Sequence, residues 1–254
     1  MARQDSALMR LPSEIRLMIY DYLFDDKGND TLAIRHENPS LYHQKEHRRR
    51  SYRIIGSGLL RQSQLTTYEM TTDVDFHPSI LRVNRKIYQE ASHKLYAAHT
   101  FDFGKDIEGV VPFFSDLTPQ TRCLIPEISL IKRGSVYCRD YDRCEWSTLC
   151  GYLRDDMQLR SMRLVVEGGK PSLGWAGLPT YSVGDYKTLS MVKYEALEWV
   201  WELLSIKGLR QLDIVPQIHH CPPSHSAGMA FFASFSATID TEFASFLRSE
   251  MLAV

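Results

Sequence analysis

Cysteine and histidine are the residue types in this chain that could hold a metal ion. Cys138, Cys144 and Cys150 recur at intervals of six residues. Zinc ligands usually come as pairs with about two to four residues between them, so this spacing favours buried free thiols. The five cysteines, an odd number at irregular positions, argue against a disulfide framework and for a reducing compartment.

Histidines gather near the C-terminal end at His219, His220 and His225, with Cys221 among them. Two adjacent prolines follow Cys221 and indicate a loop, which is a poor frame for a fixed metal site. The chain also lacks the Gly-x-Ser-x-Gly, Gly-x-x-x-x-Gly-Lys, Gly-x-Gly-x-x-Gly and His-Glu-x-x-His motifs. We therefore predict no catalytic residue, no metal site and no cofactor.

A basic cluster in the N-terminal part of the chain could bind nucleic acid or direct nuclear import. It comprises His43, His47, Arg48, Arg49, Arg50, Tyr52 and Arg53. A solvated loop is the alternative, and the formal net charge of −1 gives no whole-protein field that recruits nucleic acid or an anionic membrane. Residues 36–50 are expected to be the most mobile internal stretch, because they offer little apolar area to offset the entropy of ordering.

The elements that would position a functional surface begin with a helix from Pro12 to about Phe24. Proline is tolerated in the first helical turn, and Glu14 interacts favourably there with the helix dipole. Apolar residues recur with a helical period and form one stripe: Leu11, Ile15, Met18, Ile19, Tyr22 and Leu23. Leu17 and Tyr20 widen the apolar surface, so we expect two partners for this helix, its own core and something else.

A second helix is predicted to run to about Ala97, with Ser79 as its N-cap. Its buried stripe is expected to consist of Ile80, Val83, Ile87, Ala91 and Leu95. Glu90 and Lys94 stand four residues apart in the order that favours a surface ion pair. Residues 101–103 alternate apolar and polar, as in a short strand. Since neither helix can bury its stripe alone, the two helices are predicted to pack on each other.

These two segments together resemble a known family. Leu-Pro-x-Glu-Ile ahead of Ile-x-x-x-Leu, at residues 11–23, is similar to the opening helix of an F-box. Leu-x-Val-Asn-Arg-x-Ile-Tyr-x-Glu-Ala-x-x-x-Leu-Tyr followed by Phe-x-Phe, at residues 81–103, is similar to the second signature of F-box-like proteins of filamentous fungi. Many members of that group are described only as domains of unknown function. The resemblance covers about residues 8–24 and 78–104.

The resemblance implies a protein-binding module that docks on the Skp-type adaptor of a cullin–RING ubiquitin ligase. The adaptor-binding residues are expected to be Leu11, Pro12, Ile15, Leu17, Ile19, Tyr20 and Leu23. Five of them match positions of the F-box helix. The other two, Leu17 and Tyr20, are included because they lie on the flank of the apolar stripe, where we expect an exposed contact.

Residues 25–79 separate the two matched segments, whereas a compact F-box is a bundle of three helices with short connections. Leu32–Ile34 and Tyr52–Ile55 are short β-prone runs, so a hairpin excursion is predicted rather than a bare loop. Because the insertion divides the adaptor surface, the resemblance implies a binder more directly than it implies a ligase subunit.

Helical and strand patterns alternate beyond residue 104. The predicted helices cover 107–114, 146–156 and 191–204, the predicted strands 128–131, 162–166 and 209–215, and a long loop 168–185 after the glycines that end the second strand. Strands and helices in alternation indicate βα units with a parallel sheet, and right-handed crossovers would place the helices on one face.

The predicted fold class is therefore α/β, with α+β character at the N-terminus. The preferred architecture is an F-box-like helical motif followed by βα units in a small, mainly parallel, degenerate leucine-rich-repeat-like sheet, and a small Rossmann-like sheet is the alternative. Two domains are expected: residues 1–104 as the F-box-like region with its insertion, and residues 105–254 as a repeat-like interaction region.

Composition points to a soluble intracellular protein, cytoplasmic or nuclear, without a membrane partner. Hydrophobic residues make up 44% and charged residues 24%, which are ordinary globular values. The first six residues lack the basic-then-apolar build of a signal peptide. The longest stretch of low polarity, residues 227–237, is far too short to span a bilayer.

Three functions remain open. The first is a substrate receptor that links an unknown client protein to the ligase, which an exposed face at Ile15 and Ile19 would favour. The second is a scaffold or interaction protein with no ligase role, which full burial of that face would favour. The third is an enzyme without a recognisable motif that uses residues 168–185 and 219–225. One of the Trp199 and Trp201 side chains is expected to anchor a partner at the surface.

Overall fold

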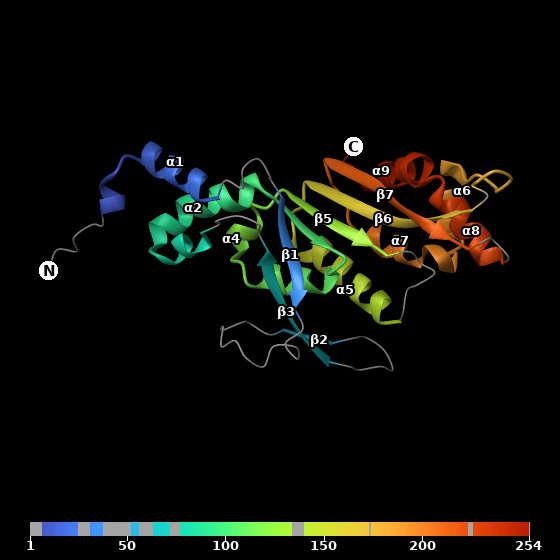
Figure 1. The fold of residues 1–254 in the computed structure, drawn as a ribbon, viewed down its shortest axis with the longest axis horizontal. Helices are drawn as coiled ribbons and strands as arrows, with labels where there is room; N and C mark the ends of the chain where they lie inside the picture. The colour runs from blue at the N-terminus through green and yellow to red at the C-terminus, as the bar shows by residue number, and fades with distance from the viewer. Residues whose placement is uncertain are drawn as a thin grey trace.

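A computed structural model of the chain describes residues 7–24, 31–37, 52–55, 63–71, 77–133, 140–172, 174–222 and 226–253. The described residues form a mixed α/β structure around one sheet, which confirms the predicted class (Figure 1). None of the helices in these ranges is long and apolar enough to cross a lipid bilayer.

The sheet has the strand order β2-β3-β1-β4-β5-β6-β7. Its strands are β1 (Thr31–Glu37), β2 (Tyr52–Ile55), β3 (Ser63–Thr71), β4 (Thr100–Gly104), β5 (Glu127–Lys132), β6 (Ser161–Pro171) and β7 (Gln211–Cys221). The strands β1, β4, β5, β6 and β7 are parallel to their neighbours within this group, and β3 runs antiparallel to β1 and β2. Because these parallel strands follow one another in chain order without a reversal, the sheet has the winding of a repeat array rather than of a doubly wound fold.

Helices cover the two ends and one face of this sheet. They are η1 (Ala7–Arg10), α1 (Ser13–Phe24), η3 (Pro78–Arg82), α2 (Arg85–Ala98), η4 (Ile107–Gly109), α3 (Val110–Ser115), α4 (Pro119–Arg122), α5 (Asp140–Asp156), α6 (Val183–Met191), η6 (Glu195–Leu197), α7 (Glu198–Leu203), α8 (Ala227–Ser236), η7 (Ile239–Phe243) and α9 (Ala244–Met251). In Figure 1, α1 and α2 lie at one end, and α6, α8 and α9 gather at the opposite end.

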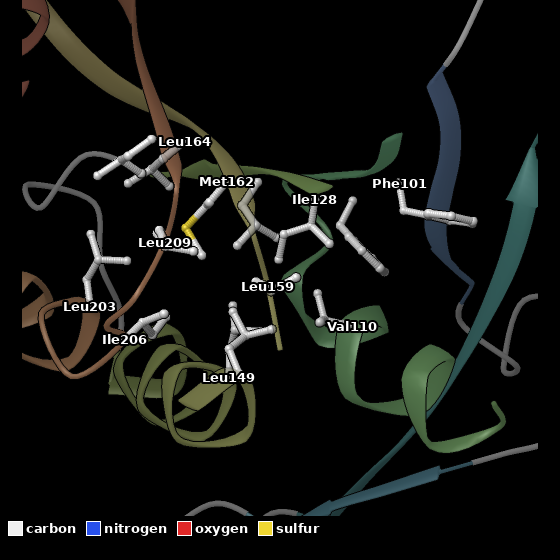
Figure 2. Packing of buried hydrophobic residues seen from close by; sticks show 14 of the residues in the cluster. Phe101, Val110, Ile128, Leu149, Leu159, Met162, Leu164, Leu203, Ile206 and Leu209 are labelled. Carbon is white, nitrogen blue, oxygen red and sulfur yellow. The ribbon is translucent and has the colours of Figure 1, made fainter. Parts of the chain in front are cut away.

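One face of the sheet carries the hydrophobic core. Alternate residues of the parallel strands are buried, and neighbours in register form a row of Phe101, Ile128, Met162 and Leu212. Figure 2 shows side chains of this face directed toward Leu149 of α5. The intervening residues, such as Arg163 and Val165, are exposed or half-buried, as expected for a sheet with one solvated face.

The insertion between the two motifs contributes strands to the main sheet. The strands β1 and β2 form where the β-prone runs predicted them. The predicted hairpin is made by β2 with β3, and β3 also pairs antiparallel with β1 and lies between the two. β1 pairs in parallel with β4 through Thr31 opposite Thr100. The predicted domain boundary between residues 104 and 105 consequently falls between β4 and β5, two neighbouring strands of one sheet.

The predicted end of the second C-terminal strand at Gly168 and Gly169 is wrong, since β6 continues to Pro171. A Cβ atom on Gly169 would lie 2.5 Å from Phe232 Cε1, and one on Gly168 would lie 2.9 Å from Ser236 Oγ. The glycines therefore allow α8 to approach the strand closely. The Gly169 N–H also donates a 2.8 Å hydrogen bond to Ser236 Oγ.

The predicted loop 168–185 and the predicted helix 191–204 are right only in part, since β6 and α6 take up the two ends of the loop and the helical residues begin at Glu195. α6 begins inside the expected loop, where Ser182 and Asp185 form a capping box. It ends at Met191, and the chain then turns at Lys193, whose φ is 52°. This turn places Tyr194 against Phe231, with ring centroids 4.8 Å apart, before η6 and α7 complete the segment. Such a tertiary contact overrides local helix propensity.

The N-cap of α2 is Asn84 rather than the predicted Ser79. The Asn84 side chain accepts a 2.9 Å hydrogen bond from the Ile87 N–H. The short helix η3 precedes it and takes up Ser79. Ile87, Ala91 and Leu95 are buried as predicted, whereas Val83, before the cap, is 59% exposed.

Candidate docking surface on the first helix

Helix α1 is placed by its contact with α2, as the two motifs predicted. Its inward side consists of Arg16, Tyr20 and Phe24, which are all buried, and Arg16 is only 4% exposed. These residues recur every four positions and therefore lie on one face of the helix. Ile15, which was expected to share a core with Ile87, is instead exposed.

A charged network joins the two helices at this contact. The Arg16 guanidinium donates from Nε to Glu90 Oε2 at 2.8 Å and from Nη2 to Glu90 Oε1 at 2.6 Å. Tyr20 OH donates to Glu90 Oε2 at 3.1 Å, so one carboxylate accepts from both residues. We call Arg16, Tyr20 and Glu90 the Arg16 clamp. The predicted surface pair of Glu90 and Lys94 is wrong, because both side chains bind α1 instead.

The contacts within the clamp favour the charged forms of Arg16 and Glu90 and the neutral form of Tyr20. Hydrogen bonding to Arg16 lowers the pKa of the Glu90 carboxyl. Hydrogen bonding to Glu90 raises the pKa of Arg16, and burial raises the pKa of Tyr20. The two-pronged geometry between a planar guanidinium and a carboxylate is directional, so it fixes orientation as well as distance.

Further bonds hold the remainder of α1. Lys94 Nζ lies 2.8 Å from Asp21 Oδ1 on the flank of the helix pair. The buried His99 ring places Nδ1 at 2.8 Å from the Leu95 carbonyl oxygen and Nε2 at 3.1 Å from the Phe24 carbonyl oxygen.

The residues that flank the insertion, at the end of α1 and the start of η3, lie side by side. The His77 N–H donates to the Leu23 carbonyl oxygen at 3.4 Å, which brings the start of η3 beside the last turn of α1. The helices α1, η3 and α2 are therefore assembled in spite of the residues that separate them in sequence. A surface that needs both motifs can be built in this chain.

The outward side of α1 is apolar. Four large side chains stand exposed there, Leu11 at 36%, Ile15 at 43%, Met18 at 65% and Tyr22 at 84%. At about 100° per residue Ile15, Met18 and Tyr22 fall within roughly 60° of one another, opposite the buried side, and Leu11 lies two residues before the helix begins. We call these four residues the α1 stripe. A continuous apolar strip on a surface marks an interaction site more often than an isolated apolar residue does.

The predicted adaptor residues divide between the two sides of α1. Leu11, Pro12 and Ile15 are exposed, and Leu17, Ile19 and Leu23 are half-buried. The expectation that Tyr20 is exposed is wrong, because its hydroxyl binds Glu90 inside the helix contact. The sequence-based list omitted Met18 and Tyr22, the two most exposed members of the stripe. Their period with Ile15 was the signal that could have included them.

The solvated face of the sheet is a second surface, which we call the sheet face. Ile131, Val165 and Val215 form a half-buried apolar row across β5, β6 and β7. Ion pairs surround this row: Arg35 with Asp102 at 2.8 Å, Lys105 with Glu167 at 2.7 Å, and Arg163 with Asp213 at 3.6 Å. Positive and negative side chains thus alternate on this face.

The cysteines and histidines do not converge within the described ranges. In that part of the chain, no group of three or more histidine, cysteine or acidic residues could hold a metal ion. Cys150 and Cys221 are buried, and burial raises the pKa of both thiols. His219 and His220 are exposed. Cys138, His225 and the Cys144 side chain lie outside the described residues.

The predicted basic cluster lies outside the described residues, apart from the backbone of Tyr52 and Arg53 in β2. The expected tryptophan anchor stays a prediction, since Trp199 and Trp201 are both half-buried. Trp199 packs against Trp146, with ring centroids 5.9 Å apart, and against Phe243.

Fold and surfaces together define a class of protein: a helical pair that presents an apolar stripe, attached to a singly wound parallel sheet. The chain belongs to the family described as Domain of unknown function (DUF7730), whose profile matches residues 1–179. That match includes α1, α2 and the strands β1 to β6, and it excludes β7 and the helices α6 to α9. No curated protein and no solved structure matches the chain.

Proposed function

We propose that this protein is an F-box-like substrate receptor, which links a client protein to a cullin–RING ubiquitin ligase through a Skp-type adaptor. The observation that supports this function best is the outward position of the α1 stripe. An amphipathic helix normally turns its apolar side toward its own core. Here the helix buries Arg16 together with Tyr20 and Phe24, which leaves the apolar stripe on the opposite side for a partner.

The chemistry of the stripe suits a helical partner or an apolar groove. Leu11, Ile15, Met18 and Tyr22 present anchors at the i, i+4, i+7 and i+11 positions that helix-in-groove recognition uses. Met adapts its shape to a partner surface, and Tyr adds a polar tip to a large apolar side chain. Leu11 and Ile15 also belong to the motif that resembles the F-box helix.

The sheet face is the proposed client surface. It lies on strands of the same sheet that β1 and β4 join to the helical pair, so the adaptor site and the client site belong to one body. A receptor of this kind performs no chemistry, because it acts by raising the local concentration of client lysines near the ligase. The Arg35–Asp102 and Arg163–Asp213 pairs would set the register of the client around the apolar row.

The test is a pull-down with a purified recombinant Skp-type adaptor. The wild-type chain should retain the adaptor, and a Met18→Asp, Tyr22→Asp variant should lose it while it melts close to the wild type. The double change Met191→Asp, Val192→Asp is the matched control, because these exposed apolar residues lie on a turn far from α1 in sequence. A Leu17→Asp, Tyr20→Asp variant is unsuitable, because it would place a charge in the buried clamp.

Failure of the wild-type chain to bind any Skp-type adaptor would contradict the ligase role. Equal recovery by the wild type and the Met18→Asp, Tyr22→Asp variant would contradict the contact at the stripe. A scaffold protein without a ligase role would then be the function that the same two surfaces support.

A further inference from the structure

Helix α1 could in principle face α2 with either of two sides. One side carries the α1 stripe, and the opposite side carries Arg16, Tyr20 and Phe24. Burial of the stripe would remove four large apolar side chains from water, which the hydrophobic effect favours. The opposite side also offers apolar burial, through Tyr20 and Phe24 in the core. Some feature of the contact must therefore select between the two sides.

We propose that the ion pair between Arg16 and Glu90 is a positioning device, which sets the rotation of α1 about its axis and keeps the α1 stripe facing outward. The use of that stripe as an adaptor site rests on the function proposed above, whereas the rotation itself does not. Arg16 and Glu90 are then positioning residues, since they act on a partner only through the stripe.

The geometry of the clamp supports this assignment. Two parallel N–H···O bonds from one guanidinium permit little rotation, and the Tyr20 hydroxyl binds the same carboxylate from the next turn of α1. A turn of α1 that brought the stripe inward would carry Arg16 away and leave the Glu90 charge against apolar side chains. Uncompensated charge at such a contact is strongly unfavourable.

The other bonds of α1 do not choose a side in the same way. His99 and His77 bind the carbonyl oxygens of Phe24 and Leu23. Helix carbonyls project along the helix axis, so these bonds fix the position of the C-terminal end more than the face that earlier turns present. The Lys94–Asp21 pair is more exposed and supplements the clamp from the flank.

The pair is partly buried, with 5% of the Arg16 side chain and 22% of the Glu90 side chain exposed. Ion pairs withdrawn from water often add little net stability, and their best-attested role is the choice of one arrangement among several. The two residues come from different motifs, Arg16 from the first and Glu90 from the second, 74 residues apart. Their pairing explains why each motif carries a charged residue within an otherwise apolar helix face.

The test measures the accessibility of the stripe directly. A Met18→Cys variant is labelled with N-ethylmaleimide, and the modified peptide is quantified by mass spectrometry. In this background, Arg16→Glu should reverse the preference of α1 and slow labelling at position 18 at least about fivefold, because most molecules would bury the stripe. The charge exchange Arg16→Glu, Glu90→Arg should restore the original rate.

Two controls separate rotation from loss of structure. Arg10→Glu makes the same charge change at an exposed position and should leave labelling unchanged. A Met191→Cys reporter should label at one rate in all these variants, since Met191 is exposed on a distant turn. If α1 simply detached in Arg16→Glu, labelling at position 18 would stay fast or rise, and either result would overturn the proposal.

A pull-down of the adaptor with the same variants tests whether the orientation of α1 controls adaptor binding. Arg16→Glu should lose the adaptor, and the charge exchange should regain it. Slow labelling of Arg16→Glu in a protein that never binds an adaptor would contradict the proposed function alone. Unchanged labelling with normal adaptor binding would contradict the positioning role alone.

Discussion

The helices α1 and α2 are both amphipathic, yet they turn opposite sides toward the molecule. α2 buries Ile87, Ala91 and Leu95 and leaves polar residues outside, as a helix on a hydrophobic core is expected to do. α1 buries Arg16 and Tyr20 and leaves Met18 outside. α1 also places Tyr20 and Phe24 in the core, so its inward side combines apolar burial with a directional ion pair, whereas α2 relies on its apolar stripe.

The two helices also differ in which parts of the molecule they contact. The buried side of α2 continues into the sheet, where Tyr96 stacks on Phe101 with ring centroids 5.8 Å apart. α1 has its principal contact in α2 and adds no large aliphatic side chain from its stripe to the core. Hydrophobic burial therefore stabilises both helices, in α1 through Tyr20 and Phe24, while the stripe of α1 stays exposed.

The largest expected effect is on α2. Replacement of Ile87 by Ala should lower the free energy of unfolding by about 2–5 kcal/mol, because the side chain is fully buried and the change leaves a cavity. Denaturant unfolding of the wild type and the variant measures the difference. Val83→Ala, at the exposed residue just before the N-cap of α2, is the matched control, and it should change stability by less than about 0.5 kcal/mol.

Acid should act next on the contact between the helices. Arg16 holds the pKa of Glu90 below its usual value of 4.5, so the charged carboxylate stabilises the folded state at higher pH. This contribution is complete above that usual value and is lost as the pH falls from there through the lowered folded pKa. Melting temperatures of the wild type and Glu90→Gln should therefore converge in acid.

Other carboxyl groups also titrate in this range, so the difference between the two proteins is the informative quantity. Hydrogen bonding lowers the pKa of Asp155 and of Asp185 as well, and both groups are present in each protein. A constant difference in melting temperature from pH 7 to acid would show that the Glu90 charge contributes nothing to folding.

Tyr20→Phe should have a smaller effect. The phenyl ring keeps the packing of the buried side chain, and only the 3.1 Å hydrogen bond to Glu90 is removed. A loss of about 1 kcal/mol is expected, since Arg16 still satisfies the carboxylate. Thermal unfolding at neutral pH measures it. A loss as large as that of Ile87→Ala would mean that the clamp, rather than the α2 core, dominates this end of the molecule.

Local patterns in the sequence predicted part of this fold well. α1, the buried residues of α2, and the strands that became β4, β5 and β7 follow apolar periodicity, which neighbouring residues determine. The prediction that Gly169 ends a strand is wrong because this glycine makes room for Phe232 and Cys221, which are more than fifty residues away in sequence. Distant side chains cannot be inferred from a local window.

The candidate site shows the same limit. The residues of the α1 stripe could be listed from their spacing, but the direction in which they point could not. Direction depends on the pairing of Arg16 with a carboxylate 74 residues later, and an isolated arginine in a helix pattern reads as a solvated residue. The closure of the insertion by His77 and Leu23 likewise depends on a contact between distant segments.

The smallest effect on stability is expected at the stripe itself, and it sharpens the comparison most. Met18→Ala removes as many side-chain heavy atoms as Ile87→Ala, yet it should change the free energy of unfolding by no more than about 0.5 kcal/mol, because Met18 is mostly solvated already. Denaturant unfolding of both variants under one set of conditions tests this directly. If Met18→Ala cost as much as Ile87→Ala, the stripe would be part of the core and the two helices would not differ. A small cost combined with weaker adaptor binding would separate the two roles, since the same apolar chemistry would then support folding in α2 and association in α1.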